Sequence, residues 1–259
     1  SLLAAANEQD HESEISSGKP LIGRAARSEE RAYPLLADDH LLDHICTLLA
    51  AHRLHIDPAP QFTTSSAPPQ GDSPDPLPSF ATSLLTTANL LNITGLPDPE
   101  NARLHLEASR QAALTQLAQA WLQSPEHTDL HHVPHLKPEG EWRNDPLETR
   151  RFVVDLLAAI PDETWWSFSA FLADLRRDYP DFQRPASDYD SWFIRDTRSN
   201  EFLRGFEHWE DVDGALIRYL ITGPLHWLGI VDLAFPEEDL SLMEASAFRR
   251  SKWSKLLLG

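Results

Sequence analysis

The sequence predicts a mainly α-helical fold with short β-hairpins that includes a winged-helix-like domain. Apolar residues recur at helical spacing in several segments of the 259-residue chain. Short apolar runs that favour strands follow the last of these segments, and helices followed by short strands are typical of a winged-helix domain. A hydrophobic content of 41%, with eight Trp, is sufficient for a buried core.

Three kinds of segment make up the predicted amino-terminal half. Residues 1–34 are polar, rich in Ser and Glu and without sustained periodicity, so we expect a disordered polar tail. Residues 35–57 and 84–140 form a helical region, which a Pro-rich loop at 58–80 interrupts. Seven prolines in that loop exclude a helix or a central strand.

The helical region contains two amphipathic segments. In the first, Leu41, Ile45 and Leu48 lie on one face, and we expect Cys46 to be an inert core residue of the same stripe. The second runs over about residues 84–123, with a break at a Gly-Leu-Pro sequence near its start.

Residues 141–259 form the predicted winged-helix-like domain. Its first helix has the clearest start signal in the chain, Asp145 followed by Pro146. An Asp at this position accepts hydrogen bonds from free backbone N–H groups, and Pro suits the first helical position. The helix is expected to end before Pro161.

A second helix and a hairpin follow in this domain. We expect the helix over residues 162–179, with Trp165 in the core and Trp166 at its rim, because neighbouring helical positions point about 100° apart. Two short apolar runs, 192–195 and 201–203, predict strands joined by a polar turn.

The last predicted helix covers about residues 210–221 and ends at Gly223-Pro224. His226 and Trp227 then lie in a short turn or helix, and Gly229 releases the chain into the strand IVDLAF. We interpret His226 and Trp227 as corner residues of the core, since no nucleophile or carboxylate partner is identifiable. The predicted shared core comprises Phe152, Leu156, Trp165, Phe168, Leu172, Leu216 and Trp227.

The net charge of −18 argues against broad binding to nucleic acid, which requires clustered Lys and Arg. The exception is the stretch AFRRSKWSKLLLG at 247–259, which contains no acid. Its candidate nucleic-acid-binding residues are Arg249, Arg250, Lys252, Trp253 and Lys255. We expect any DNA binding there to be weak, independent of sequence and sensitive to salt.

Two clusters have residue types that bind metals. The weak candidates for zinc or nickel are His127, His131, His132 and His135. These four lie in a Pro-containing loop without the H-E-x-x-H or C-x-x-C spacing, so we expect no metal. A carboxylate group suited in principle to magnesium comprises Glu207, Glu210, Asp211 and Asp213. Acids in the first turn of a helix already complement its positive end, so we expect no cofactor here and no catalytic centre.

Neither a membrane nor a disulfide is indicated by the sequence. No apolar run is long enough to span a bilayer, and the first residues lack the basic and apolar regions of a secretory signal. A single Cys excludes an internal disulfide and fits a reducing compartment, so we predict a cytoplasmic protein.

Several stretches of the second half resemble a known family. They are GEWRNDPLETR, PDFQRP, DYDSWFIRD and EFLRGFEHWEDVDGALIRYLITGPLHWLGIVDLA. They are similar to bacterial helicase-associated proteins whose shared region resembles the amino-terminal domain of XPB-type helicases. The resemblance covers roughly residues 100–259 and implies winged-helix character and a nucleic-acid context, without a catalytic centre. The G-x-x-x-x-G-K-[ST] phosphate loop of a helicase motor is absent from the sequence.

These observations predict a non-catalytic, DNA-linked accessory or regulatory module of helicase-associated type, whose partner is DNA or a helicase. The first alternative is a protein–protein interaction scaffold that uses a winged-helix surface, which the acidic composition favours. A remote alternative is a metal-dependent hydrolase or nuclease that uses the His and carboxylate clusters.

Overall fold

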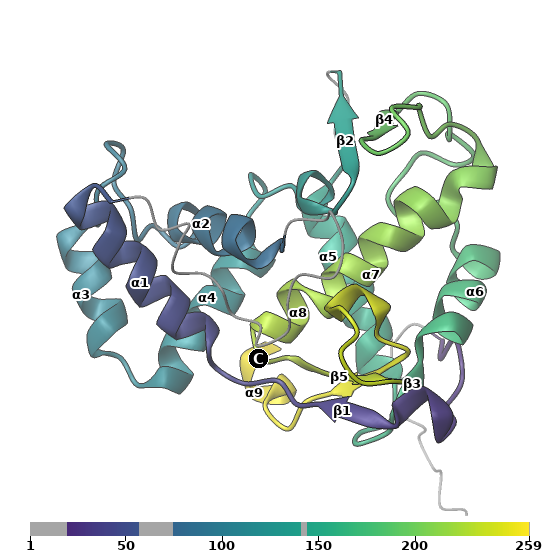
Figure 1. The fold of residues 1–259 in the computed structure, drawn as a ribbon, viewed down its shortest axis with the longest axis horizontal. Helices are drawn as coiled ribbons and strands as arrows, with labels where there is room; N and C mark the ends of the chain where they lie inside the picture. Colours follow the sequence, from purple (N-terminus) through teal and green to yellow (C-terminus); the bar gives the residue numbers. More distant parts are fainter. Residues whose placement is uncertain (1–19, 57–74, 141–143, 259) are drawn as a thin grey trace, which may run out of the picture.

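Helices and a small antiparallel sheet make up the protein, a mixed α/β fold (Figure 1). The computed structural model describes residues 20–56, 75–140 and 144–258. The helices are α1 (Leu41–Leu54), α2 (Leu77–Thr87), α3 (Pro99–Glu107), α4 (Arg110–Leu122), α5 (Pro146–Ala159), α6 (Phe168–Asp178), α7 (Ala215–Thr222), α8 (Pro224–Trp227) and α9 (Ser254–Leu258). The strands are β1 (Tyr33–Leu35), β2 (Leu136–Glu139), β3 (Trp166–Ser167), β4 (Phe193–Asp196), β5 (Val231–Phe235) and β6 (Ala247–Arg250).

The larger sheet has the strand order β1-β5-β6-β3 and is antiparallel throughout. Leu233 in the central strand β5 lies opposite Leu35 of β1 and Phe248 of β6. All residues of β5 are buried, including Asp232, which accepts hydrogen bonds from the Ala37 N–H and from Arg249. A separate pair, β2 with β4, forms an arm that projects from the helices (Figure 1).

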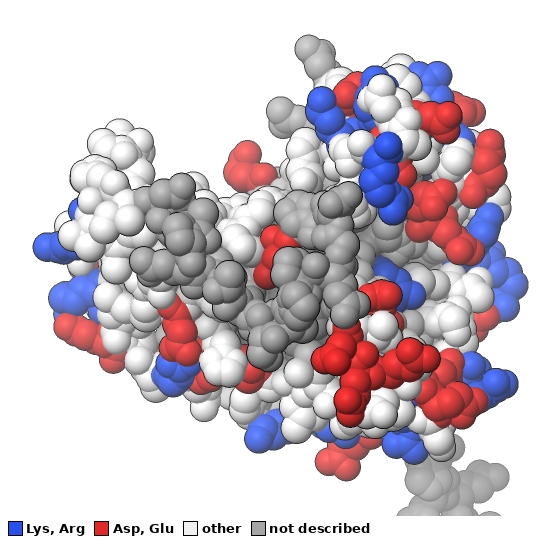
Figure 2. Space-filling view, in the orientation of Figure 1, with Lys and Arg blue, Asp and Glu red and all other residues white. Residues whose placement is uncertain are grey.

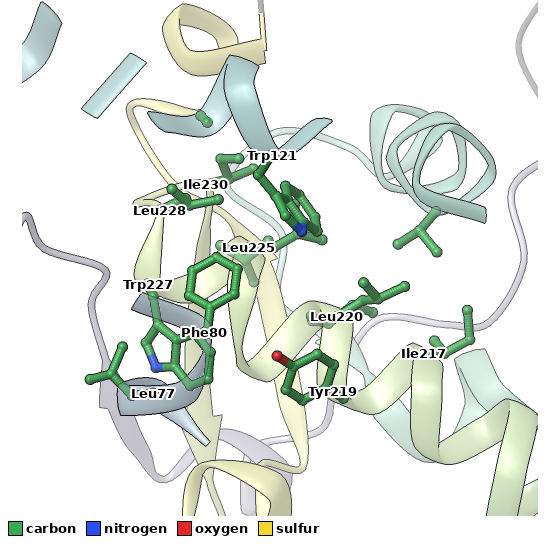
Figure 3. Packing of buried hydrophobic residues seen from close by; sticks show 14 of the residues in the cluster. Leu77, Phe80, Trp121, Ile217, Tyr219, Leu220, Leu225, Trp227, Leu228 and Ile230 are labelled. Atoms are coloured by element: carbon green, nitrogen blue, oxygen red, sulfur yellow. The ribbon is translucent and has the colours of Figure 1, made fainter. Parts of the chain in front are cut away.

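A single hydrophobic cluster extends from Ile22 to Leu257 and joins the helices to the sheet. Within it the ring centroid of Trp227 lies 5.2 Å from that of Phe80 and 6.2 Å from that of Tyr219. Figure 3 shows the three rings close together. The predicted core members Phe152, Leu156, Phe168, Leu216 and Trp227 are buried, and Leu172 packs against them half-buried. The predicted core is therefore confirmed, apart from Trp165.

Trp165 and Trp166 have the opposite roles to those predicted. Trp166 is buried and its Nε1 donates to the carbonyl of Ile22, whereas Trp165 is half-exposed. The reason is that Trp166 belongs to strand β3, and α6 begins at Phe168 instead of residue 162. Side chains of adjacent strand residues point to opposite faces, so the helical spacing assigned the wrong Trp to the core.

Residues 20–34, which we expected within a disordered tail, are part of the folded protein. Strand β1 pairs with β5, and the backbone N–H of Gly23 donates to Asp174. The carboxylate of Glu30 binds Arg24 and accepts a hydrogen bond from Ser167. The Arg24 guanidinium is the main cause of the lowering of the pKa of Glu30 to about 2. The tail prediction is thus wrong for this part, and residues 1–19 lie outside the described residues.

Three further features differ from the predictions. Helix α2 already begins at Leu77, inside the predicted loop 58–80, whose residues 58–74 lie outside the described part. Strand β4 pairs with β2. The predicted hairpin is present as a short pairing, with one bridge between Arg195 and Phe202 and a backbone hydrogen bond from Leu203 to Ile194. Cys46 is exposed on α1, and partial burial raises the pKa of its thiol.

The helix predicted at 210–221 begins with one π-helical turn, Glu210–Gly214, before it continues as α7. Gly223 ends α7, and α8 and Gly229 (φ 80°) then lead the chain into β5, as predicted. His226 is buried and its Nδ1 lies 2.8 Å from the carbonyl of Val231, while burial lowers the pKa of the imidazole. His226 and Trp227 therefore form the corner between the last helix turn and strand β5.

The start of α5 provides a test of the local sequence signal. The Asp145 side chain accepts hydrogen bonds from the N–H groups of Leu147 and Glu148, at 2.8 and 3.1 Å. We expect Asp145→Ala to lower the free energy of unfolding by about 1 kcal/mol, the typical value of a helix cap. Urea unfolding followed by Trp fluorescence measures this. The matched control is Asp155→Ala on the exposed face of the same helix, and an equal loss in both variants would contradict the capping role.

Candidate functional site

Arg150 of α5 is completely buried and binds four groups around the end of α4. Its Nε donates to Asp129 at 2.7 Å, and Nη1 donates to the carbonyls of Trp121 and Ser124 at 2.6 and 2.7 Å. Nη2 donates to the carbonyl of His127. Asp129 also accepts a hydrogen bond from the Trp121 indole at 2.9 Å. This network holds the loop after α4 against α5, and its groups are fully engaged with one another.

The His-rich loop brings two of its four imidazoles together. His127 and His132 stack with ring centroids 4.8 Å apart, and their Nδ1 atoms lie 2.8 Å from Ser83 Oγ and 3.0 Å from Ser79 Oγ. Burial, with a smaller contribution from His127, lowers the pKa of His132 to about 4, so this imidazole is neutral at pH 7. His131 is exposed, and His135 lies apart at the base of β2.

The stacked pair is part of a buried chain of side chains. His127 Nε2 lies 3.4 Å from Asp129, so that Ser83, His127 and Asp129 form a chain of the Ser–His–Asp type. The side chain of His127 is 0% exposed, however, and no substrate reaches its ring. Within residues 20–56, 75–140 and 144–258, no group of three or more His, Cys, Asp or Glu side chains is placed to hold a metal ion.

The carboxylates at 207–213 point in separate directions. Asp213 is buried and receives two hydrogen bonds from Arg184, at 2.8 and 2.9 Å, and one from Gln183 at 2.7 Å. Burial raises the pKa of Asp213, and the two donors oppose that rise. Glu210 pairs with Arg176 on α6, Asp211 contacts His208, and Glu207 is exposed. These acids therefore do not converge on a common point where a cation could bind.

The basic segment 247–258 is balanced by acids from other parts of the chain. Arg249 binds Asp232 at 2.9 Å and lies over the ring of Trp165. Arg250 and Lys255 both bind Asp162. Lys252 is exposed and stacks over Trp253. Acids from other segments thus pair with three of the cations of this segment, and DNA binding by the segment stays a prediction.

A group that sequence reasoning missed covers the β2–β4 arm and the segment after it. We call it the aromatic–arginine face, and its members are Phe193, Phe202, Phe206, Arg176, Arg195 and Arg204. The three Phe side chains are 42%, 37% and 43% exposed. Each ring has a guanidinium over it at 4.0 to 4.9 Å: Arg204 over Phe193, Arg195 over Phe202 and Arg176 over Phe206. The alternation of Phe and Arg in SWFIRDTRSNEFLRGF was the available signal.

A pocket of about 260 Å³ lies between the arm, α6 and the π-helical turn. Its polar lining includes His135, Asp196, Arg198, Asp211 and Arg218. A π-helical turn within a helix frequently marks a functional position. The pocket was not predicted, because Arg218 is a single cation in an otherwise apolar helix and the residues around it come from distant segments.

A scan against protein-family models and searches of curated proteins and solved structures found no match to this chain. Among the helices that the structure describes, none is long and apolar enough to cross a membrane. The function therefore has to be inferred from the side chains of the molecule itself.

The buried network predicts a large effect of removing its cation. Arg150→Met leaves the Asp129 carboxylate buried without its guanidinium, and we expect the free energy of unfolding to fall by about 3–5 kcal/mol. The matched control is Arg151→Met, which removes the exposed neighbour on the same helix and should change the stability by less than about 0.5 kcal/mol. Urea unfolding of both variants measures their free energies of unfolding. Similar small losses of stability in the two variants would show that the network is dispensable.

The same network predicts a loss of stability in acid. Burial opposes ionisation of Asp129, but contacts with His127, Arg150 and Trp121 outweigh it and lower the pKa of its carboxyl. Its contribution is therefore fully present above the unfolded-state pKa of about 3.9 and is lost as the pH falls through the lower folded-state pKa. We expect Asp129→Asn to flatten the decline of unfolding free energy below about pH 4. A decline as steep as that of the parent protein would contradict this assignment.

Proposed function

We propose that this protein is a non-catalytic interaction module that binds another protein through the aromatic–arginine face. The observation that carries the proposal is the set of three partly exposed Phe rings, each with a guanidinium over it, on the projecting arm and the segment after it. Aromatic residues and Arg are enriched at protein interfaces and supply most of their binding energy. Exposed apolar groups that polar residues surround mark interaction sites when they lie together on a surface.

The charge distribution favours a protein over a nucleic acid as the partner. Arg195 is neutralised by Glu139, and Arg176 by Glu210, while Arg198 on the same arm binds Asp196. Figure 2 shows acidic and basic side chains mixed over this end of the molecule. A polyanion gains little from guanidinium groups that are already paired, and the net charge of −18 repels it.

The partner that fits this face presents apolar side chains to the Phe rings and a carboxylate to Arg204. Arg204 is exposed and stacks on Phe193 and Phe202, with no carboxylate partner among the described residues. Apolar side chains of a partner would cover the rings, and a carboxylate would complete the hydrogen bonds of this guanidinium.

The winged-helix assignment and the helicase-associated resemblance stay predictions, and so does the cytoplasmic location. For DNA binding, α7 would be the helix to enter a major groove. Its residues Leu216, Ile217, Tyr219, Leu220, Ile221 and Thr222 are buried. The burial of α7 supports an accessory role that acts through a protein partner instead of DNA.

The test places a photo-crosslinking amino acid at Phe202 and, as a matched control, at the exposed Leu104 on α3. In cells that express the protein naturally, we expect one protein to crosslink at position 202 and none at 104. With that partner purified, Phe193→Ala and Arg204→Ala should each weaken binding about tenfold or more, the size typical of a residue central to an interface. Leu104→Ala should leave the affinity unchanged.

Nucleic acid is the competing outcome of the same experiment. Labelled single-stranded and duplex DNA are titrated at low salt against the parent protein and the Phe193→Ala variant. Saturable DNA binding that Phe193→Ala abolishes would assign the face to stacked bases and overturn the proposal. Equal crosslinking at positions 202 and 104 would show that the face is not an interface.

A further inference from the structure

Arg218 of α7 is a half-buried cation without a carboxylate partner among the described residues. Its Nη1 donates to the carbonyls of Met243 and Ala245, at 3.0 and 2.8 Å, and its guanidinium lies over the ring of Phe168 at 4.3 Å. A guanidinium that is partly removed from water is stabilised by an anion more strongly than one that is fully solvated. The two carbonyls and the ring therefore hold a fixed, incompletely compensated charge at the pocket.

The remaining N–H groups of Arg218 are available to a ligand. Nη1 has two hydrogens, and the two carbonyls use both. Nε and Nη2 have no hydrogen-bond partner among the described residues. Neither atom is fully buried, so both are open to solvent. Arg218 lines the pocket, and these three N–H groups form the edge of the fork that binds a planar carboxylate through two parallel hydrogen bonds.

The other lining residues restrict the anion. Asp196 pairs with Arg198, which is the main cause of the lowering of the Asp196 pKa to about 2, and Glu210 pairs with Arg176. Asp211 adds a further negative charge, in contact with His208. These acids disfavour a multiply charged anion such as phosphate. The apolar lining residues are Pro134, Leu136, Leu172, Leu203, Ala215 and Met243.

We propose that this pocket binds a small monocarboxylate with an apolar body, whose carboxylate is held by Arg218. A volume of about 260 Å³ is slightly below the usual range of ligand pockets and limits the ligand to a small molecule. The carbonyls that fix Nη1 and the ring of Phe168 orient the guanidinium before the ligand arrives, which reduces the entropy lost on binding. The site is independent of the protein partner proposed above.

The experiment compares phenylacetate with phenylacetamide, which has the same apolar body without the charge. Isothermal titration and backbone NMR are run on the full chain. We expect phenylacetate to shift the amide signals of Gly214 and Ala215 saturably, and phenylacetamide to bind at least about tenfold more weakly, because it lacks the charge-assisted hydrogen bonds. Isovalerate should bind like phenylacetate, and acetate more weakly, since it has no apolar body.

Variants locate the binding in the pocket. Arg218→Met should weaken phenylacetate binding at least about tenfold, whereas Arg103→Met, at an exposed ion pair on α3, should leave it unchanged. Leu203→Trp, which retains Arg218 but fills the pocket, should also weaken binding and serves if Arg218→Met does not fold.

Several results would overturn the proposal. They are equal affinity for phenylacetate and phenylacetamide, no saturable binding of either apolar acid in the millimolar range, tighter binding of inorganic phosphate than of phenylacetate, and NMR shifts confined to residues outside the pocket.

Discussion

The position of the candidate sites depends on the buried guanidinium of Arg150. A charge with no exposure to water has to be compensated inside the protein, and here Asp129 and three backbone carbonyls do so. These partners lie at the end of α4 and in the turn Asp129–His132, which contacts β2. Strand β2 therefore leaves the core at a place that the ion pair determines. One wall of the pocket and one strand of the arm follow from it.

A second buried ion pair determines the other strand of the arm. Arg184 binds Asp213 in the π-helical turn and stacks over Trp192 at 4.3 Å, directly before β4 begins. The π-helical turn thus has a partner on the arm side, and the same turn lines the pocket through Glu210, Asp211 and Gly214. Replacing such pairs by apolar residues is often neutral for stability, so their main consequence here is a defined orientation of the arm relative to α7.

Features decided by neighbouring residues could be predicted from the sequence. The cap at Asp145, the end of α7 at Gly223 and the corner at Trp227 all depend on a few adjacent positions. Features that depend on pairing between segments far apart in the sequence could not be predicted. Strand β1 joins β5 across about two hundred residues, and the same distance separates the Ala37 N–H from its acceptor Asp232. The exchange of Trp165 and Trp166 has the same origin, because β3 forms through its pairing with the distant strand β6 and with Ala25. The basic segment was misjudged since Asp162 and Asp232, its partners, lie 88 and 17 residues away.

Because the chain is acidic, a guanidinium that none of its own carboxylates binds is informative about function. The chain has 40 Asp and Glu for 22 Lys and Arg, so a guanidinium has many carboxylates available to it. Exposed cations such as Arg53 and Arg151 need none, because water solvates them. Arg218 is half-buried, lies on an aromatic ring and has only carbonyl partners among the described residues. An external carboxylate therefore gains favourable electrostatic energy when it binds this guanidinium. Substrate and ligand sites work in the same way when they hold a charged side chain in a fixed position before the ligand arrives. The signal lies in the contrast with Arg150 and Arg184, each of which binds a buried carboxylate of the fold, Asp129 or Asp213.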